Sequence, residues 1–306
     1  MTFKANGLKA VRIIDKATDI AIGIFLCLAL LFGGYSLWDS NLVYQEADAA
    51  EYAVFRPEEE GPGFAELRRA NPEVIAWLTV NDTPIDYPVT QADDNDKYIN
   101  TNAKGEYALS GSIFLDHRNS PHFDDFNSII YGHHMEKKRM FGALSDFSDQ
   151  EYFDSHPYGG LYFDGKDHGL EFFAIVLTDA YDGALFSPVG TGGEARQAYL
   201  DRILARAVCA RELSVDTEDR IIVLSTCTSA ITNGRYMLFG KLTDELHPPE
   251  QRPAARGPYL TVQPAHGWRL PVGLWLTILA ILILLLARLE KKHGRHGARK
   301  ERKSNL

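Results

Sequence analysis

A cysteine at the end of an apolar segment is the residue in this chain best suited to nucleophilic chemistry. Cys227 follows the Ile-Ile-Val-Leu run of residues 221–224 after only two polar residues. A buried strand would fix the position of the sulfur, and the loop beyond it would give a substrate access. A free cysteine after an apolar run is also commonly an inert core residue. The thiol by itself therefore leaves both a catalytic and a packing role open.

A histidine occupies the same kind of position after another apolar segment. Residues 129–131 lead through a glycine to His133 and His134. Because the ordinary pKa of a thiol is about 8.5, a neighbouring imidazole or cation is needed to produce a useful thiolate. The alternatives are solvated loop histidines or a metal site completed by His117 or His122. The chain lacks a helical HExxH motif and paired cysteines, so the sequence predicts no metal.

An arginine begins the next apolar segment after the cysteine. Arg235 lies eight residues beyond Cys227 and follows the turn residues 232–234, Thr-Asn-Gly. A β-hairpin would return this side chain to the sulfur. Its planar guanidinium could hold a developing oxyanion or substrate carbonyls, a role that lysine fills poorly. The alternative is a solvated arginine at a strand end.

The elements that must position these residues are short and mostly extended. Eight β-branched or aromatic segments are separated by clusters of Gly, Pro, Asn and Asp, and two helical stretches interrupt them. Closing many short strands into a barrel removes unpaired edges, so the sequence predicts a mainly β domain built as a small β-barrel decorated by helices. The predicted strands are 74–80, 85–89, 112–115, 128–131, 161–164, 171–177, 220–225 and 235–242, and the helices are 140–147 and 194–205.

Two uncharged apolar runs lie near the ends of the chain. Residues 20–38 and 270–287 are 19 and 18 residues long, and each would reach about 27–29 Å as a helix. Lys and Arg residues precede the first run and follow the second, which predicts a two-pass membrane protein with both termini cytoplasmic and the middle outside. The alternatives are a cleaved signal peptide for the first run and a core helix for the second.

Charge and cysteine content restrict the function of the middle segment. Residues 17–287 carry 20 Lys and Arg against 38 Asp and Glu, a formal charge of −18, which excludes a nucleic-acid-binding domain. Cys27 lies within the first apolar run, so only Cys209 and Cys227 remain outside the predicted membrane segments. A disulfide between them is an alternative, although the domain is large enough to be stabilised by its own core.

The order of these features predicts the domain organisation. A single folded domain is expected between the two membrane segments. The predicted parts are a cytoplasmic N-terminus (1–18), a transmembrane anchor (19–38), an acidic stalk (39–63), a catalytic domain (64–246), a linker rich in Pro, Arg and Gly (247–269), a transmembrane helix (270–287) and a basic cytoplasmic tail (288–306).

Six short motifs, in order between residues 64 and 242, resemble those of class B sortases, a family of cysteine transpeptidases. They are Asn71-Pro72-Glu73-Val74-Ile75-Ala76-Trp77, Ile85-Asp86-Tyr87-Pro88-Val89, Gly111-Ser112-Ile113-Phe114-Leu115-Asp116, Tyr131-Gly132-His133-His134, Met140-Phe141 and Leu224-Ser225-Thr226-Cys227.

The resemblance implies a fold and a set of site residues. The fold is a sortase-like closed eight-stranded β-barrel with N-terminal and inserted helices, here flanked by two transmembrane helices. The catalytic residues would be Cys227, His133 and Arg235, and Ser225 and Tyr131 would lie near the substrate groove. No metal or organic cofactor is implied.

The resemblance also implies a reaction. Cys227 would attack a threonine carbonyl in the C-terminal sorting motif of an exported protein, and His133 would transfer protons during formation of the thioacyl enzyme. A peptidoglycan cross-bridge amine would resolve the thioester and anchor the protein to a Gram-positive cell wall. The second membrane segment is more typical of pilus-assembling class C sortases, so a pilin lysine is the alternative acceptor. A membrane cysteine peptidase, which uses water, and a non-catalytic peptide-binding domain also stay open as functions.

Overall fold

The N-terminal part of the chain forms one long helix. The computed structural model of the protein describes residues 2–57, 63–228 and 232–249, and α1 runs over Thr2–Glu46. Within it, Ile13–Glu46 is the one helix among the described residues that is long and apolar enough to cross a membrane. A signal sequence has the same properties, so the helix is either an anchor or a signal. The second predicted membrane segment, 270–287, lies outside the described residues.

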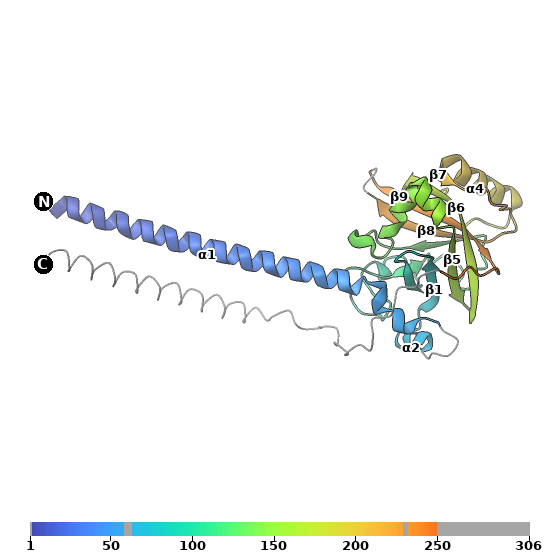
Figure 1. The fold of residues 1–306 in the computed structure, drawn as a ribbon, viewed down its shortest axis with the longest axis horizontal. Helices are drawn as coiled ribbons and strands as arrows, with labels where there is room; N and C mark the ends of the chain where they lie inside the picture. Colours follow the sequence, from blue (N-terminus) through green and yellow to red (C-terminus); the bar gives the residue numbers. More distant parts are fainter. Residues whose placement is uncertain (1, 58–62, 229–231, 250–306) are drawn as a thin grey trace. The chain divides into compact units, whose positions relative to one another are not determined.

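The folded domain is a closed barrel of eight strands with a ninth strand added at one edge (Figure 1). The strands pair in the order β5-β1-β2-β3-β4-β8-β9-β6, and pairing of β5 with β6 closes the ring. This confirms the closed eight-stranded barrel expected from the sequence. The strands are β1 Val74–Val80, β2 Asp86–Thr90, β3 Ile113–Leu115, β4 Asn127–Tyr131, β5 Tyr158–Phe163, β6 Lys166–Asp179, β7 Ala207–Ala210, β8 Ile221–Thr228 and β9 Gly234–Thr243.

The long strand β6 makes closure possible. Along one edge it pairs with β9 over nearly its whole length. Along its other edge, the first half pairs with β5 and the second half with the short strand β7. The sequence predicted the second half of β6 but neither its first residues nor β7, because the Gly-containing start and the four-residue partner carry little β-strand pattern.

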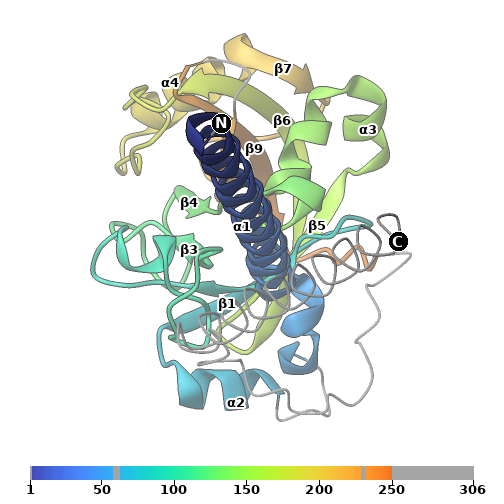
Figure 2. The ribbon, with the colours of Figure 1, turned by 90° about the vertical axis from the view of Figure 1, so that its left-hand side faces the viewer.

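Short helices fill the connections, as Figure 2 shows for α2, α3 and α4. The predicted helix 194–205 is confirmed as α4, Gly193–Arg206. The predicted helix 140–147 is instead a 3₁₀-helix, η5, which leads into α3. The helical elements besides α1 and α4 are α2 Gly63–Ala70, α3 Gln150–Ser155, η1 Ala49–Glu51, η2 Ala53–Phe55, η3 Lys97–Ile99, η4 Glu136–Lys138 and η5 Gly142–Ser148.

Two apolar clusters pack on opposite faces of the sheet. Alternation along β8 places Ile222 and Leu224 in the cluster that fills the barrel interior. Ile221 and Val223 lie in a second cluster, on the outer face, that also contains the buried face of α4. Burial on both faces explains why β8 reads as an uninterrupted apolar run.

Residues 47–56, assigned from the sequence to an acidic stalk, pack against the barrel. Ala47 and Tyr52 are buried, and the Tyr87 hydroxyl donates to the Ala47 carbonyl at 2.8 Å. Asp48 accepts two hydrogen bonds of 2.7 Å from the guanidinium of Arg139. The guanidinium of Arg56 pairs with the buried Asp86 carboxylate. This segment is therefore part of the folded domain, although its acidic composition gives little sign of it.

Candidate active site

Two parallel strands bring the predicted histidine and cysteine together. In the β4–β8 pair Tyr131 lies opposite Ser225, and the Gly132 amide donates to the Ser225 carbonyl at 3.1 Å. The Thr226 hydroxyl donates back to the Gly132 carbonyl at 2.8 Å. His133 and Cys227 are the next residues of the two segments, so they lie at the same level, where the two adjacent strands end.

An antiparallel pair brings the arginine to the other side of the cysteine. Cys227 lies opposite Arg235 in the β8–β9 pair, as the predicted hairpin requires. Directly opposite residues of an antiparallel pair point their side chains to the same face, with Cβ atoms about 4.5–5.5 Å apart. Cys227 is exposed and Arg235 is half-buried, its Nη1 donating to the Gly234 carbonyl at 3.0 Å. The sulfur is thus accessible. The strand that leads to His133 lies on one side of it, and the strand that carries Arg235 lies on the other.

The ring of His133 is oriented by a backbone contact. Its Nε2 lies 2.9 Å from the carbonyl oxygen of Ile99. Because a carbonyl can only accept, this hydrogen bond requires a proton on Nε2, and in the neutral ring Nδ1 is then the basic nitrogen. The ring is half-buried. His133 is therefore held through one ring nitrogen, and its other ring nitrogen is available for proton transfer.

The two proposed substrate-binding residues lie directly below this site on neighbouring strands. Ser225 is buried, and its hydroxyl has no hydrogen-bond partner among the described residues. Tyr131 is half-buried, and its hydroxyl donates to Asp116 Oδ2 at 3.0 Å. Sequence alternation places both side chains on the same face of the sheet as Cys227.

Sequence reasoning missed the acidic partner of Tyr131. Asp116 is fully buried and also accepts hydrogen bonds from Arg118 Nε at 2.8 Å and Nη2 at 2.7 Å. Burial alone would raise the pKa of Asp116, but the hydrogen bonds from Arg118 and Tyr131 outweigh it and lower the pKa to about 2. A clue was present in the sequence, since Asp116 ends an apolar strand as His133 and Cys227 do.

The second cysteine of the barrel domain has a different environment. Cys209 is buried in β7, and its Sγ lies 3.4 Å from the Ser148 carbonyl oxygen. Burial raises the pKa of this thiol, which disfavours the thiolate. Both Cys209 and Cys227 are free thiols, so the structure contradicts the alternative of a disulfide between them.

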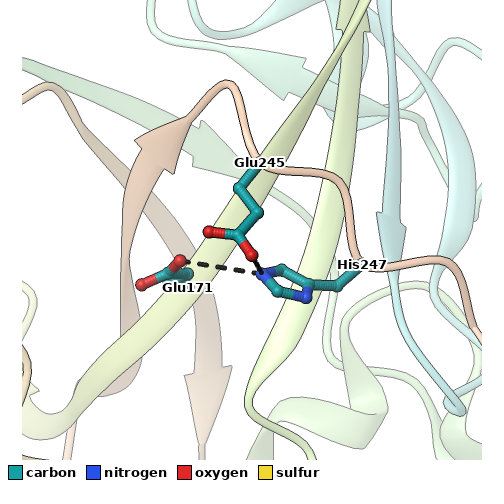
Figure 3. A group of neighbouring side chains, drawn as sticks. All are labelled: Glu171, Glu245 and His247. Atoms are coloured by element: carbon teal, nitrogen blue, oxygen red, sulfur yellow. Dashed lines mark ion pairs between the residues drawn. The ribbon is translucent and has the colours of Figure 1, made fainter.

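Only one group of side chains in the described part of the chain is arranged closely enough to hold a metal ion, and it is remote from Cys227. Figure 3 shows Glu171, Glu245 and His247, whose Nε2 lies 3.7 and 3.9 Å from the two carboxylates. The group lies at the end of β9 opposite Arg235, roughly 30 Å along the strand. It does not include any of the histidines proposed from the sequence.

A cavity of the barrel domain is also separate from the cysteine. It has a volume of about 410 Å³ and lies against β1 and β5, between the segments that precede α2 and follow β9. Trp77, Asp86 and His168 are among its lining residues, and no predicted site residue is. Cys227 itself is exposed, so its thiol is open to a substrate.

Known proteins that the chain resembles in sequence and fold are sortases B, some of them described as class B. No family model matches the chain. The chain is 38% identical to sortase B of Listeria monocytogenes over 181 residues, covering 58% of this chain and 72% of that protein. It is 46% identical to the crystal structure of sortase B from the type II pilus of Streptococcus pneumoniae, with a TM-score of 0.53, covering 60% of this chain and 99% of that one.

A structure with bound substrate is also similar. The chain is 29% identical to a Staphylococcus aureus sortase B–substrate complex, with a TM-score of 0.56, covering 60% of this chain and 85% of that one. The similarity in each case spans most of the known protein, and at 58–60% of this chain it matches the size of the barrel domain.

Proposed function

This chain belongs to the class B sortase family, and from that membership we propose that Cys227, His133 and Arg235 carry out its reaction. The reaction class is that of a sortase, a transpeptidase. The observation that supports the three residues most strongly is the strand register, because one parallel and one antiparallel partner place a histidine and an arginine beside the same exposed thiol.

Each residue has a role that its environment suits. The thiolate of Cys227 attacks the carbonyl carbon of the scissile peptide bond, and the C–N bond breaks to give a thioester and an amine. His133 donates the proton to the leaving amine and later removes one from the incoming amine. Arg235 donates hydrogen bonds to the oxyanion that develops on the carbonyl oxygen. Ser225 and Tyr131 line the floor beneath the acyl donor.

The acyl donor is proposed to be an exported protein with a C-terminal sorting signal. A substrate complex exists for the similar Staphylococcus aureus enzyme. The open, strand-edged site suits an extended peptide. The acceptor is a primary amine, and we propose a peptidoglycan cross-bridge amine, so that the product is a protein attached to the cell wall.

A pilin lysine is the second candidate acceptor. The observation that favours it is the 46% identity to a sortase B from a type II pilus. The two acceptors differ in chemistry, since one is part of a glycan-linked peptide and the other a side chain of a folded protein. Incubating the enzyme with a thioester-forming peptide and each amine separately, and comparing the rates of amide formation, distinguishes wall anchoring from polymerisation.

Three substitutions test the proposed residues. Cys227→Ala and His133→Ala should each abolish amide formation while the far-ultraviolet circular dichroism and thermal midpoint stay near those of the wild type, because neither side chain is part of the buried core. Cys209→Ala is the matched control, since it removes a thiol that is buried away from the site, and it should remain active. Activity in Cys227→Ala, or loss of activity only in Cys209→Ala, would overturn the assignment.

An amine-dependence assay separates transfer from hydrolysis. A sortase should release the leaving peptide faster as hydroxylamine is added, because the amine resolves the thioester. A cysteine peptidase would release it at its full rate without added amine, because water resolves its thioester. A peptide-binding domain would form no thioester at all, so mass spectrometry of the acyl enzyme separates it from both enzymes.

The topology proposed from the sequence requires its own test. We propose that α1 anchors the chain, that the barrel lies outside the membrane, and that residues 270–287 span it a second time, with both termini cytoplasmic. Protease added to intact cells without their wall should cut within residues 247–269 while a C-terminal tag stays protected. Digestion of the tag from outside would show that the second run does not span.

A further inference from the structure

The connection between β6 and α4 begins beside the proposed catalytic arginine. Residues 180–192, called here the roof segment, follow Thr178, which lies opposite Arg235 in the β6–β9 pair. The Ala180 amide donates to the Asn233 carbonyl at 2.9 Å. The segment then contributes Leu185, which is fully buried, to the outer-face cluster that also contains Val223 of β8. The roof segment therefore covers the face of the barrel on which Cys227 opens.

The opposite side of the roof segment is attached to β4, the strand that leads to His133. Arg118 Nη2 donates to the Phe186 carbonyl at 2.7 Å, and the same guanidinium holds Asp116 through both carboxylate oxygens. Asp116 in turn accepts the Tyr131 hydroxyl. A continuous set of hydrogen bonds thus joins the roof segment to Tyr131, which is directly opposite Ser225.

A second contact holds the same part of the segment from the base of β4. The Asn127 side chain donates to the Ser187 carbonyl at 3.1 Å and accepts from the Val189 amide at 2.6 Å. Asn127 is fully buried, whereas the side chain of Arg118 is 41% exposed and donates to the Phe186 carbonyl. Arg118 is the more exposed of these two side chains, so it is the one chosen for substitution.

We propose that Arg118 is a positioning residue that holds the roof segment as one wall of the acyl-donor groove, so that it sets substrate affinity without taking part in the chemistry. This inference rests on the proposed function, since it assumes that the groove beside Cys227 receives a peptide. Ordering a loop when the substrate binds costs conformational entropy and lowers the affinity. A wall that is already fixed before binding avoids this cost. Arg118 touches none of the three reacting side chains, so the rate of the bound complex is unaffected.

The guanidinium shape is essential to this role. Nε and Nη2 donate to Asp116, and Nη2 also donates to the Phe186 carbonyl. These contacts require several donors that point in different directions from one rigid plane. A lysine ammonium can keep the charge beside Asp116 but cannot maintain this set of contacts. Arg118→Lys should therefore retain stability better than it retains substrate affinity.

Steady-state kinetics of the full-length chain in detergent test the inference. The probe is a fluorogenic peptide with a threonyl scissile bond, selected from a peptide library for cleavage by the wild type. Arg118→Gln should raise KM roughly tenfold, the loss expected for one hydrogen bond to a charged group, with kcat within about twofold. Arg118→Lys should show the same direction of change. Lys166→Gln removes an exposed ion pair with Asp244 and should match the wild type.

Hydrogen exchange of the same proteins provides a readout that does not depend on substrate. Arg118→Gln should speed exchange at the amides of residues 181–189 and leave β8 and β9 unchanged. An unchanged KM, a fall in kcat alone, or faster exchange spread over the whole barrel would overturn the positioning role. Absence of Cys227-dependent cleavage in the wild type would instead refute the proposed function, so the two failures are distinguishable.

Discussion

Replacing Gly132 by alanine should disable the enzyme by displacing His133. A Cβ at this position would lie 2.5 Å from Ile113 Cδ1 and 2.7 Å from Phe141 Cδ2, whereas carbon atoms in contact keep about 3.5–4.0 Å. Relieving the overlap requires a movement of about 1 Å. Phe141 is fully buried and cannot yield easily. The residue that moves is therefore 132 itself, together with the histidine attached to it.

The size of the effect follows from how Gly132 is held. Its amide and carbonyl are both hydrogen-bonded to β8, at 3.1 Å to Ser225 and 2.8 Å from Thr226, so a shift weakens the pairing that aligns His133 with Cys227. Overpacking of this kind lowers the free energy of unfolding by about 1–3 kcal/mol. A displacement of about 1 Å between reacting groups lowers the rate roughly 10²-fold. Activity should thus fall far more than stability.

The assay measures both quantities in the same preparations. Thermal unfolding followed by circular dichroism gives stability, and the rate of acyl-enzyme formation, followed by mass spectrometry, gives activity. Gly160→Ala is the matched control, because a Cβ there meets its nearest atom, the His168 carbonyl oxygen, at an ordinary 3.7 Å. Acylation of Gly132→Ala at the wild-type rate, or an equal loss in Gly160→Ala, would refute the reasoning.

Three further predictions concern charged side chains. Arg235→Lys should lower kcat/KM roughly 10²- to 10³-fold, because a point charge replaces a planar donor, and wild-type turnover would contradict this. Asp116→Asn should lower the free energy of unfolding by about 2 kcal/mol near pH 7. The pKa of Asp116 in the folded protein is about 2 and lies below its value in the unfolded chain. Urea titrations should therefore show the stability difference between wild type and variant vanish as the pH falls from about 4 to about 2. Arg139→Asp should cost roughly 2 kcal/mol, and adding Asp48→Arg should restore part of it; a double variant less stable than both single variants would exclude a direct pair.

The reacting residues could be anticipated because each stands at the end of an apolar strand. Local patterns place Cys227 and Arg235 within strands and His133 just after one, and the hairpin that pairs Cys227 with Arg235 is a local feature that the turn residues predict. The closed barrel and helix α4 also follow from periodicity. The roles of these side chains in the reaction stay predictions, which substitution of each residue tests.

Features that depend on distant pairing could not be read from the sequence. The parallel pairing of β4 with β8 joins segments 94 residues apart, and nothing in either segment specifies the other as its partner. The same holds for Asp116 and Arg118, whose charges look like solvated loop residues until Tyr131 and Phe186 are placed beside them. The packing of residues 47–56 on the barrel was hidden by their acidic composition, because their contacts are made with residues from Asp86 to Arg139.

The parallel pairing of β4 and β8 also affects the rate at which the protein folds. Neither strand can reach the other through a short turn, and contacts between segments so far apart in sequence form slowly, since the entropy of closing the loop is lost before pairing compensates for it. Strands β5, β6 and β7 are synthesised between them and must find their own partners. A chain that has collapsed but has not yet paired these two strands holds Cys227 without His133 beside it. During refolding from denaturant, peptide cleavage should accordingly return with the slowest conformational phase, after most of the secondary structure has formed.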